Sequence, residues 1–459
     1  MLQDLFGLGS LPNLLTVLAG LVTARLAIRT ARTPQGAVAW VVGLLAFPLL
    51  AIPLYALVGG VAGLRGSADA PELEVEPATL RAAAAASGPD RLRAVTVEPF
   101  EGGNHARLLV DGRATFDAIH DAIDRAETEV LVQFYILAAD IVGHALGERL
   151  KAAARRGVRV HLLCDLVGSL LLPRGYVRDL RAAGVEVHGF RGPGPRWLVR
   201  PNFRNHRKAV VVDGRVGFTG GLNARRDHLD GGTRFAAWRD TFVRIEGPAA
   251  AQLRTVFAED WDGIAPDPLP PLPAPPPAAG TMRACIVATG RADGLERGPI
   301  LLCGLIGMAR RRLWIASPYF VPDIDVLTAL QLAALRGVDL RVLVPRPPDK
   351  WVPWLAARAY FDDVQAAGGQ VLEYEPGFAH QKVMLVDDDL ASIGTMNIDI
   401  RSAALNFEQT ALVHDRGFAR EVEAMLLRDF ARCRDAALHP PGALVRFFAP
   451  VARLFAPLL

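Results

Sequence analysis

The feature that most constrains the fold is a repeat, because the chain runs twice through the same alternation of helical and strand-like segments. In the first half, helices are predicted over 115–126 and 143–156, and strands over 129–136 and 158–165. The second half repeats this order, with helices over 299–310 and 326–335 and strands over 312–318 and 338–345. Alternating helices and apolar strands are typical of layered α/β domains. Such self-similarity indicates a duplication, so catalytic groups are expected in pairs.

Length and composition suggest where the domains lie. The 459 residues suffice for two or three domains, and proline crowds the segment 266–277. A segment this rich in proline predicts an extended linker. We therefore expect one α/β domain over 69–265, a linker over 266–280 and a second α/β domain over 281–459.

Two apolar stretches precede the first domain, over 5–26 and 36–62. The second is longer than the about 20 residues that a helix needs to cross a bilayer. The first does not resemble a signal peptide, since its start lacks Lys and Arg and no small-residue cleavage site follows. These observations predict a two-helix transmembrane hairpin within 1–68, which would make the chain a multi-pass protein of the cytoplasmic (inner) membrane.

Three arginines predict the orientation of this hairpin. Arg25, Arg29 and Arg32 lie in or beside the connection between the two stretches, whereas no Lys or Arg precedes the first stretch. The positive-inside rule then places the connection in the cytoplasm and the large domains on the outer side of the membrane.

Charge and cysteine content exclude several kinds of protein. The formal net charge of +3 and the pI of about 8.8 suit a phosphate ligand or an anionic membrane, but not a dedicated nucleic-acid binder. The four cysteines are scattered and form no Cys/His cluster: Cys164, Cys285, Cys303 and Cys433. Neither a disulfide framework nor a metal site is therefore expected, and no cofactor is predicted.

Each half contains the motif His-x-Lys-x-x-x-x-Asp, followed by Gly-(Gly/Thr)-x-Asn. The residues are His206, Lys208, Asp213 and Asn223 in the first half, and His380, Lys382, Asp387 and Asn397 in the second. On a strand, a spacing of two places the histidine and lysine on one face. The aspartates begin predicted hairpin turns, so we expect them to have a structural rather than a chemical role. One copy of such a motif could be structural, but two copies in the two halves of a repeat indicate a site.

These residue types suit a phosphodiester. A neutral imidazole can attack phosphorus, and a protonated imidazole can give its proton to the leaving oxygen. Lysine and asparagine side chains can stabilise the charge on the non-bridging oxygens in the transition state. This chemistry requires no metal ion.

The sequence resembles the phospholipase D superfamily and, within it, the bacterial cardiolipin synthases, over nearly the whole chain. The resemblance rests on both motifs and on Trp238-Arg-Asp240, Ser317-Pro-Tyr-Phe-Val-Pro-Asp323, Gly394-Thr-Met-Asn-Ile-Asp-Ile-Arg-Ser402 and Leu405-Asn-Phe-Glu408. It departs from the family pattern around residues 289–293 and at Ala224. The family's fold implies that each α/β domain is a phospholipase D-like α/β/α sandwich and that both form one catalytic unit.

The resemblance also implies an activity and further site residues. It implies transfer of a phosphatidyl group between two phosphatidylglycerol molecules, through a phosphohistidine on one histidine, for which we favour His206. It further implies that an acidic residue downstream of each motif orients that motif's histidine: Asp240 in the first half and Glu408 in the second. The alternatives are a hydrolase that uses water as acceptor, a nuclease, which the apolar stretches disfavour, and a non-catalytic lipid-binding scaffold.

Two further segments could contact lipid. Trp197 and several arginines surround the first motif: Arg191, Arg196, Arg200, Arg204 and Arg207. Near the C-terminus, apolar residues recur at helical spacing, with Arg446 and Arg453 between them: Leu444, Phe447, Phe448, Val451, Phe455 and Leu458. This C-terminal helix is predicted either to lie on a bilayer surface or to dock on the protein body.

Overall fold

The structure is a computed structural model that describes residues 11–31, 34–57, 77–190, 204–272, 274–290 and 296–456. It divides into two compact units. The described helices before residue 73 belong to one unit, and both halves of the repeat belong to the other.

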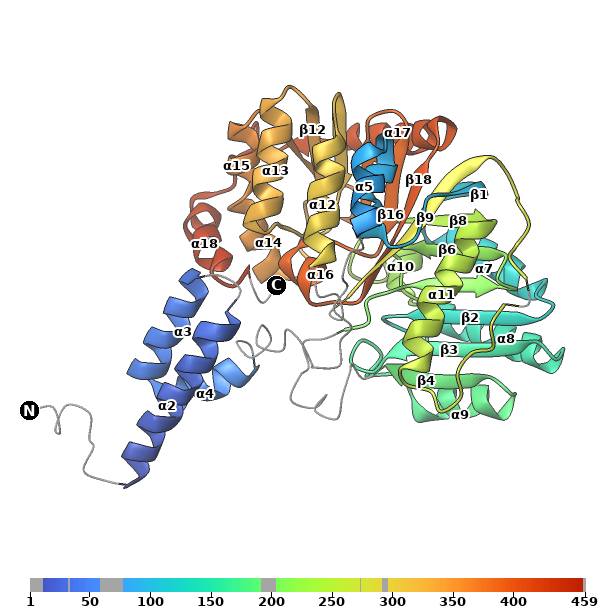
Figure 1. The fold of residues 1–459 in the computed structure, drawn as a ribbon, viewed down its shortest axis with the longest axis horizontal. Helices are drawn as coiled ribbons and strands as arrows, with labels where there is room; N and C mark the ends of the chain where they lie inside the picture. Colours follow the sequence, from blue (N-terminus) through green and yellow to red (C-terminus); the bar gives the residue numbers. More distant parts are fainter. Residues whose placement is uncertain are drawn as a thin grey trace, which may run out of the picture. The chain divides into compact units, whose positions relative to one another are not determined.

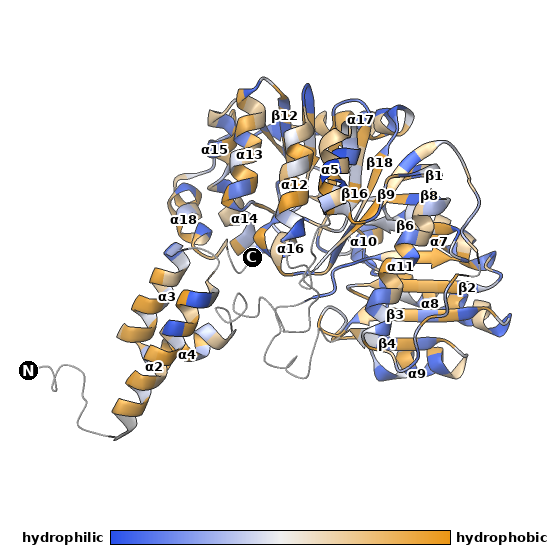
Figure 2. Ribbon diagram, in the orientation of Figure 1, coloured by the Kyte–Doolittle hydropathy of each residue, from blue (hydrophilic) through white to orange (hydrophobic). Residues whose placement is uncertain are grey.

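Within its described residues, the N-terminal unit contains the helices α2 (Leu11–Thr30), α3 (Pro34–Ala46) and α4 (Pro48–Leu57) (Figure 1). Its small core is formed by buried residues of all three helices: Ala24, Ala27, Leu44, Ala51 and Tyr55. Figure 2 shows apolar residues along most of α2 and α3.

The predicted transmembrane hairpin is wrong. Among the residues that the structure describes, no helix combines the length and apolar character needed to cross a membrane. The expected second span is divided at Phe47 into helices of 13 and 10 residues, since Pro48 has no N–H to continue the backbone ladder of α3. Each is shorter than the about 20 residues required. The expected first span includes Arg25 and Arg29 within α2. Without the two spans, the prediction of a multi-pass inner-membrane protein is also wrong. Residues 5–10 and 58–62 of the predicted spans lie outside the described residues.

The second unit contains a 15-stranded sheet that both halves share. The first half contributes β1 (Glu101–Val110), β2 (Glu129–Phe134), β3 (Arg159–Asp165), β4 (Glu186–Phe190), β5 (Ala209–Val212), β6 (Val216–Gly220) and β8 (Thr241–Glu246). The second half contributes β9 (Met282–Thr289), β10 (Arg312–Ala316), β12 (Asp339–Pro345), β13 (Gln370–Tyr374), β15 (Val383–Val386), β16 (Leu390–Gly394), β18 (Glu408–His414) and β19 (Cys433–Asp435).

The strand order reads nearly the same from either edge: β19-β13-β12-β10-β15-β16-β18-β9-β1-β8-β6-β5-β2-β3-β4. Its centre is the antiparallel pair β1–β9, where the two halves meet. From this pair outward, both halves place their strands in the same order, apart from the additional edge strand β19. The structure therefore confirms the repeated α/β architecture that the sequence pattern predicts.

Helices cover both faces of the sheet. Helices α11 (Pro248–Asp262) and α17 (Arg416–Phe430) contribute buried residues to one shared core that spans both halves. The opposite face has a separate core in each half. In the first half it lies under α7 (Asp111–Asp124), α8 (Ile141–Arg155) and α9 (Arg174–Ala182). In the second half it lies under α12 (Arg297–Met308), α13 (Ile324–Leu335), α14 (Trp351–Arg358) and α15 (Phe361–Ala366).

Short elements complete the fold: α5 (Pro77–Ala85), η2 (Gly88–Leu92), α6 (Arg93–Thr96), α10 (Asp227–Asp230), α16 (Ile400–Ala404) and α18 (Ala443–Arg453). Two small parallel pairs lie outside the main sheet. They are β11 (Phe320–Val321) with β17 (Ile398–Asp399), and β7 (Trp238–Arg239) with β14 (Phe378–Ala379). The second pair joins the two halves of the repeat.

Candidate functional site

The two His-x-Lys segments lie just before strands β5 and β15 rather than within them. Each segment pairs with a backbone segment of the other half. The N–H of His206 donates to the carbonyl oxygen of Phe407 at 2.9 Å, and the N–H of His380 donates to that of Arg239 at 2.7 Å. Phe407 and Arg239 directly precede the two acidic residues, Glu408 and Asp240. The backbone at the seam thus brings each histidine beside the acidic residue of the other half.

The histidine–carboxylate pairs are therefore crossed between the halves. Nδ1 of His206 lies 2.9 Å from both carboxylate oxygens of Glu408, and Nδ1 of His380 lies 2.7 Å from Oδ2 of Asp240. The sequence placed each acidic residue with the histidine of its own half, and the structure corrects this pairing. Each motif histidine therefore takes its carboxylate partner from the other half.

The Glu408 carboxylate is held by several donors. In addition to His206, it accepts hydrogen bonds from Oγ1 of Thr395 at 2.5 Å and from Nδ2 of Asn406 at 3.0 Å. Burial alone would raise the pKa of Glu408, but His206 and Lys208 lower it below its usual value. An ionised Glu408 accepts a hydrogen bond from Nδ1–H of His206. The tautomer that this bond selects leaves Nε2 without a proton, as the reactive nitrogen. Burial lowers the pKa of His206 to about 4, although Glu408 opposes this shift, so the imidazole is neutral at pH 7.

The second pair has a different environment. Burial raises the pKa of Asp240, although Lys382 and His228 oppose this shift. Nζ of Lys382 lies 3.1 Å from both ring nitrogens of His380. Burial, followed by the charges of Lys382 and Lys208, holds the pKa of His380 well below its usual range. His380 is therefore also neutral, with an ammonium group against its ring.

Both motif lysines are buried and point toward the seam. Each donates to the carbonyl oxygen of its own motif histidine at 2.6 Å. Burial lowers the pKa of Lys208 to about 7, although Glu408 opposes it, and that of Lys382 to about 8, although Asp240 opposes it. Two buried ammonium groups beside two neutral imidazoles favour an anionic ligand such as a phosphodiester.

The motif asparagines, Asn223 and Asn397, follow strands β6 and β16 in the chain. Oδ1 of Asn223 accepts from the N–H of Ile136 at 3.1 Å. Nδ2 of Asn397 donates to Oγ of Ser402 at 3.1 Å, whereas its Oδ1 is buried with no hydrogen-bond partner. Both side chains are buried.

The motif aspartates have the structural position that the turn pattern predicts. Asp213 and Asp387 follow β5 and β15, with φ angles of 53° and 51°. The Asp213 carboxylate accepts from the backbone N–H groups of 127–129, and that of Asp387 accepts from those of 310–312. Each side chain thus connects its own turn to the start of a neighbouring strand by hydrogen bonds. Neither aspartate contacts a motif histidine.

Two buried arginines, Arg207 and Arg239, support the seam. Arg207 donates to Asp260 at 2.8 Å and to the carbonyl oxygen of Glu408 at 3.2 Å. Near the other motif histidine, Arg239 donates to both carboxylate oxygens of Asp429 at 2.9 and 2.8 Å. Arg207 therefore fixes Glu408 from inside the protein and does not face a lipid, while Arg191, Arg196, Trp197 and Arg200 lie outside the described residues.

His228 is a third histidine at the site that the sequence did not single out. Its ring is buried and lies edge-on to the ring of His380, with centroids 5.1 Å apart. Its Nδ1 accepts from the N–H of Asn223 at 3.1 Å. The signal in the sequence is its spacing of five residues from Asn223, which Ser402 repeats relative to Asn397.

Ligand atoms of His228, Asp240 and His380 lie within 4.8 Å of one another and could in principle hold a metal ion. However, the ammonium of Lys382 contacts His380 at 3.1 Å and would repel a cation there. The cluster therefore suits an anion better than a metal.

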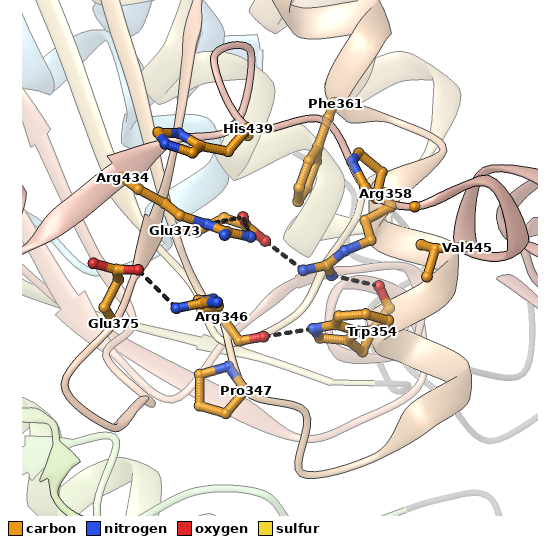
Figure 3. Close-up of a pocket in the computed structure, with 13 residues that line it drawn as sticks. Arg346, Pro347, Trp354, Arg358, Phe361, Glu373, Glu375, Arg434, His439 and Val445 are labelled. Carbon is orange, nitrogen blue, oxygen red and sulfur yellow. Dashed lines mark hydrogen bonds and ion pairs between the residues drawn. The ribbon is translucent and has the colours of Figure 1, made fainter.

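A cavity of about 420 Å³ lies elsewhere, against the start of α18, and none of the motif residues lines it (Figure 3). Its arginines are paired with glutamates: Arg346 with Glu375, and both Arg358 and Arg434 with Glu373. Each of the described arginines that line the cavity is therefore paired with a glutamate, and none of them is left to bind an anion.

Comparison with known sequences identifies relatives of this chain. The family model described as "Cardiolipin synthase, PLD-like domain" matches residues 119–261 and 302–430. "Cardiolipin synthase A" of Pseudomonas putida is 42% identical over 465 residues, covering 96% of this chain and 96% of the relative. "Cardiolipin synthase A" of Pseudomonas aeruginosa (strain LESB58) is also 42% identical, covering 96% of this chain and 94% of the relative.

Solved structures share the fold at low sequence identity. Phosphatidylserine synthase of Haemophilus influenzae Rd KW20 matches with a TM-score of 0.61 at 15% identity, covering 77% of this chain and 95% of that one. Polyphosphate kinase of Porphyromonas gingivalis matches with a TM-score of 0.51 at 15% identity, covering 82% of this chain and 56% of that one. At this identity, both likenesses concern the fold alone.

Proposed function

Because the chain belongs to the cardiolipin synthase family of phospholipase D-like proteins, we propose that it is a phosphatidyltransferase that forms cardiolipin and glycerol from two molecules of phosphatidylglycerol. One observation carries the proposal: the fold brings both His-x-Lys pairs to one buried seam, where His206 is hydrogen-bonded to Glu408 and His380 to Asp240. Two imidazoles and two ammonium groups are what a two-step phosphodiester exchange requires.

In the first step, Nε2 of His206 attacks the phosphorus of the donor lipid and the bond to the headgroup glycerol breaks. The neutral state of His206 and the Glu408 carboxylate on its Nδ1 support this role. His380 gives the departing glycerol oxygen its proton from Nε2. Since burial and the neighbouring lysines keep His380 neutral, this proton comes from the adjacent Lys382 ammonium once the phosphate anion has bound and raised the basicity of the ring.

In the second step, the terminal hydroxyl of the second phosphatidylglycerol gives its proton to His380 and attacks the phosphorus. The bond to His206 breaks, which restores the free imidazole and releases cardiolipin, and His380 returns its proton to Lys382. Lys208, Lys382, Asn223 and Asn397 hold the non-bridging oxygens through both steps. Asp240 and Glu408 act by orienting the histidines, and Asp213 and Asp387 support the turns.

The test is to give the purified chain phosphatidylglycerol, with and without other phospholipids, and to identify the products by mass spectrometry. We expect cardiolipin and glycerol in equal amounts. Phosphatidic acid and glycerol without cardiolipin would contradict the transfer and assign the site to a hydrolase. Products that require another donor lipid would contradict the assignment of phosphatidylglycerol.

A further inference from the structure

Helix α18 turns small side chains toward the protein and large apolar side chains outward. Ala449, Ala452 and the following Ala456 are buried. Six larger residues are 47% to 78% exposed, and we call them the α18 face: Leu444, Phe447, Phe448, Val451, Leu454 and Phe455. An ordinary surface helix does the opposite, since it buries its large apolar residues and presents polar ones to water.

The orientation of α18 is fixed, so the α18 face cannot simply roll inward. The Arg453 guanidinium lies 4.1 Å over the ring of Tyr360 and donates to Asp363 at 3.3 Å. At the other end of the helix, Val445 lines the cavity that also contacts Trp354 and Arg358 (Figure 3). The predicted docking on the protein body therefore occurs, but it uses only the small side chains of the helix.

The charge around the α18 face indicates what covers it. No Asp or Glu follows Asp435 in the sequence, whereas Arg446 is exposed and Arg453 closes the helix. The charged residues within α18 itself are both arginines, although Arg453 is paired with Asp363. Aromatic and aliphatic side chains together with arginine match the surface of an anionic bilayer, where the apolar groups enter the headgroup boundary and arginine meets phosphate. A second copy of the chain would instead bring the same arginines together in a two-fold interface.

We propose that the α18 face docks on the surface of a bilayer that contains anionic phospholipid. The helix has 11 residues, about 16 Å at the helical rise, so it lies along the surface rather than crossing the bilayer. The inference rests on the proposed function in one respect, because phospholipid substrates would be taken up from this surface. It identifies the segment that holds the enzyme against its substrate.

The test measures partition of the full chain onto phosphatidylcholine vesicles with and without phosphatidylglycerol. The variant L444S/F447S/L454S should bind the mixed vesicles at least about ten-fold more weakly than the unchanged chain. The matched control is L332S/L335S on α13, where the two leucines are 54% and 70% exposed, and it should bind like the unchanged chain. Equal binding of the α18 variant and the control would overturn the proposal. A loss of self-association in the α18 variant with unchanged vesicle binding would overturn it too, and would assign the α18 face to a second copy.

A second assay separates this inference from the proposed function. On short-chain phosphatidylglycerol dissolved below its micelle concentration, the α18 variant should transfer at the rate of the unchanged chain. If the unchanged chain makes no cardiolipin in any assay while only the α18 variant loses vesicle binding, the docking surface stands and the proposed function fails. If the variant loses transfer on the dissolved lipid as well, its defect lies in folding, which contradicts an outward role for these side chains.

An independent observation concerns His228 and Ser402, which hold equivalent positions five residues after Asn223 and Asn397. Nδ1 of His228 accepts from the N–H of Asn223, and Oγ of Ser402 accepts from Nδ2 of Asn397. A neutral imidazole that accepts at Nδ1 carries its proton on Nε2, which lies 3.5 Å from Nδ2 of Asn223. Nε2 then cannot accept from this amide, so both amide hydrogens of Asn223 remain available to a ligand.

The geometry points to His228 as a positioning residue that holds the backbone of Asn223, so that its side-chain amide faces a bound phosphate. Its ring is itself fixed by Trp238, with centroids 4.1 Å apart, and lies against His380. The two halves hold their asparagines through different atoms: His228 accepts from the backbone N–H of Asn223, whereas Ser402 accepts from the side-chain Nδ2 of Asn397.

The test uses H228A, H228S and H228N with two readouts, the affinity for inorganic phosphate measured by calorimetry and the kinetics of transfer. Loss of one neutral hydrogen bond should weaken phosphate binding about five-fold in H228A and raise KM more than it lowers kcat. H228N, whose side-chain oxygen can accept from Asn223, should recover most of the affinity, and H228S only part. Unchanged phosphate affinity in H228A, or a loss that H228N does not recover, would overturn this role. The calorimetric result stands whether or not cardiolipin is the product.

Discussion

The two halves of the repeat share one strand order but hold their histidines differently. His206 is bonded to a carboxylate that accepts from Thr395 and Asn406 as well, and whose pKa is lowered by its neighbours. His380 is bonded to Asp240, whose pKa burial raises, and the Lys382 ammonium lies against its ring. The duplicated framework supplies two imidazoles, whereas the side chains around them differ. The difference suits His206 to attack phosphorus and His380 to exchange protons.

The largest expected effect comes from removing either imidazole. H206A and H380A should each lower cardiolipin formation by about 10³-fold or more, because the covalent step and the proton transfer have no substitute at the seam. Product formation in phosphatidylglycerol vesicles, followed by mass spectrometry, measures this. H439A is the control, since His439 lines the cavity near α18 rather than the seam. Robust cardiolipin synthesis by both variants would contradict the two-histidine mechanism.

The crossed carboxylates should give the next largest effect, and an unequal one. E408Q should lower kcat about 10²- to 10³-fold, since Glu408 is the ionised partner that sets the tautomer of His206. D240N should cost less, because burial already favours the uncharged form of Asp240. Steady-state kinetics of both variants measure the difference. Equal losses would remove the asymmetry between the halves.

The pH dependence should report the buried lysines. The value of kcat/KM should fall below about pH 4, as His206 becomes protonated, and again between about pH 7 and 8, as Lys208 and Lys382 lose their protons. Arginine stays charged in this range, so K208R or K382R should move the alkaline decline to higher pH, at some cost in rate. A pH–rate profile for each variant checks this. An alkaline decline that neither substitution moves would assign it to another group.

The motif aspartates should affect stability rather than rate. D213N and D387N should each lower the free energy of unfolding by about 1–3 kcal/mol, because each weakens a carboxylate that holds several backbone N–H groups. Those hydrogen bonds lower the pKa of Asp213 although burial opposes them. The stability from Asp213 is therefore present above the usual aspartate pKa and is lost as pH falls through its lowered value. Denaturant unfolding at two pH values, together with kcat, measures this. A loss of activity without a loss of stability would give the aspartates a chemical role.

Much of this architecture could be predicted from the sequence, because local pattern determines it. Each predicted strand of the repeat overlaps an observed one, as 129–136 overlaps β2 and 338–345 overlaps β12. The hairpin turns at Asp213 and Asp387 also follow from local sequence. The crossed pairing does not, because it depends on Phe407 and Arg239 pairing with the His-x-Lys segments of the other half, more than a hundred residues away.

Other errors have local causes. The transmembrane prediction took Pro48 and Pro53 as kinks that a spanning helix tolerates, whereas the helix breaks at Phe47 and Pro48. His228 was missed because a single histidine carries little signal unless it is compared with Ser402 at the equivalent position of the other half. Comparing the two halves position by position would have revealed it.

The central claim is that one seam holds two histidines with different tasks, and trapping the intermediate tests it most directly. The enzyme would be mixed with phosphatidylglycerol, quenched in alkali, which preserves phosphohistidine, and digested for mass spectrometry. The phosphatidyl group or its phosphate should be found on the peptide that contains His206, with none on the peptide that contains His380. A modification on His380 alone, or none on either histidine while cardiolipin forms, would contradict the account.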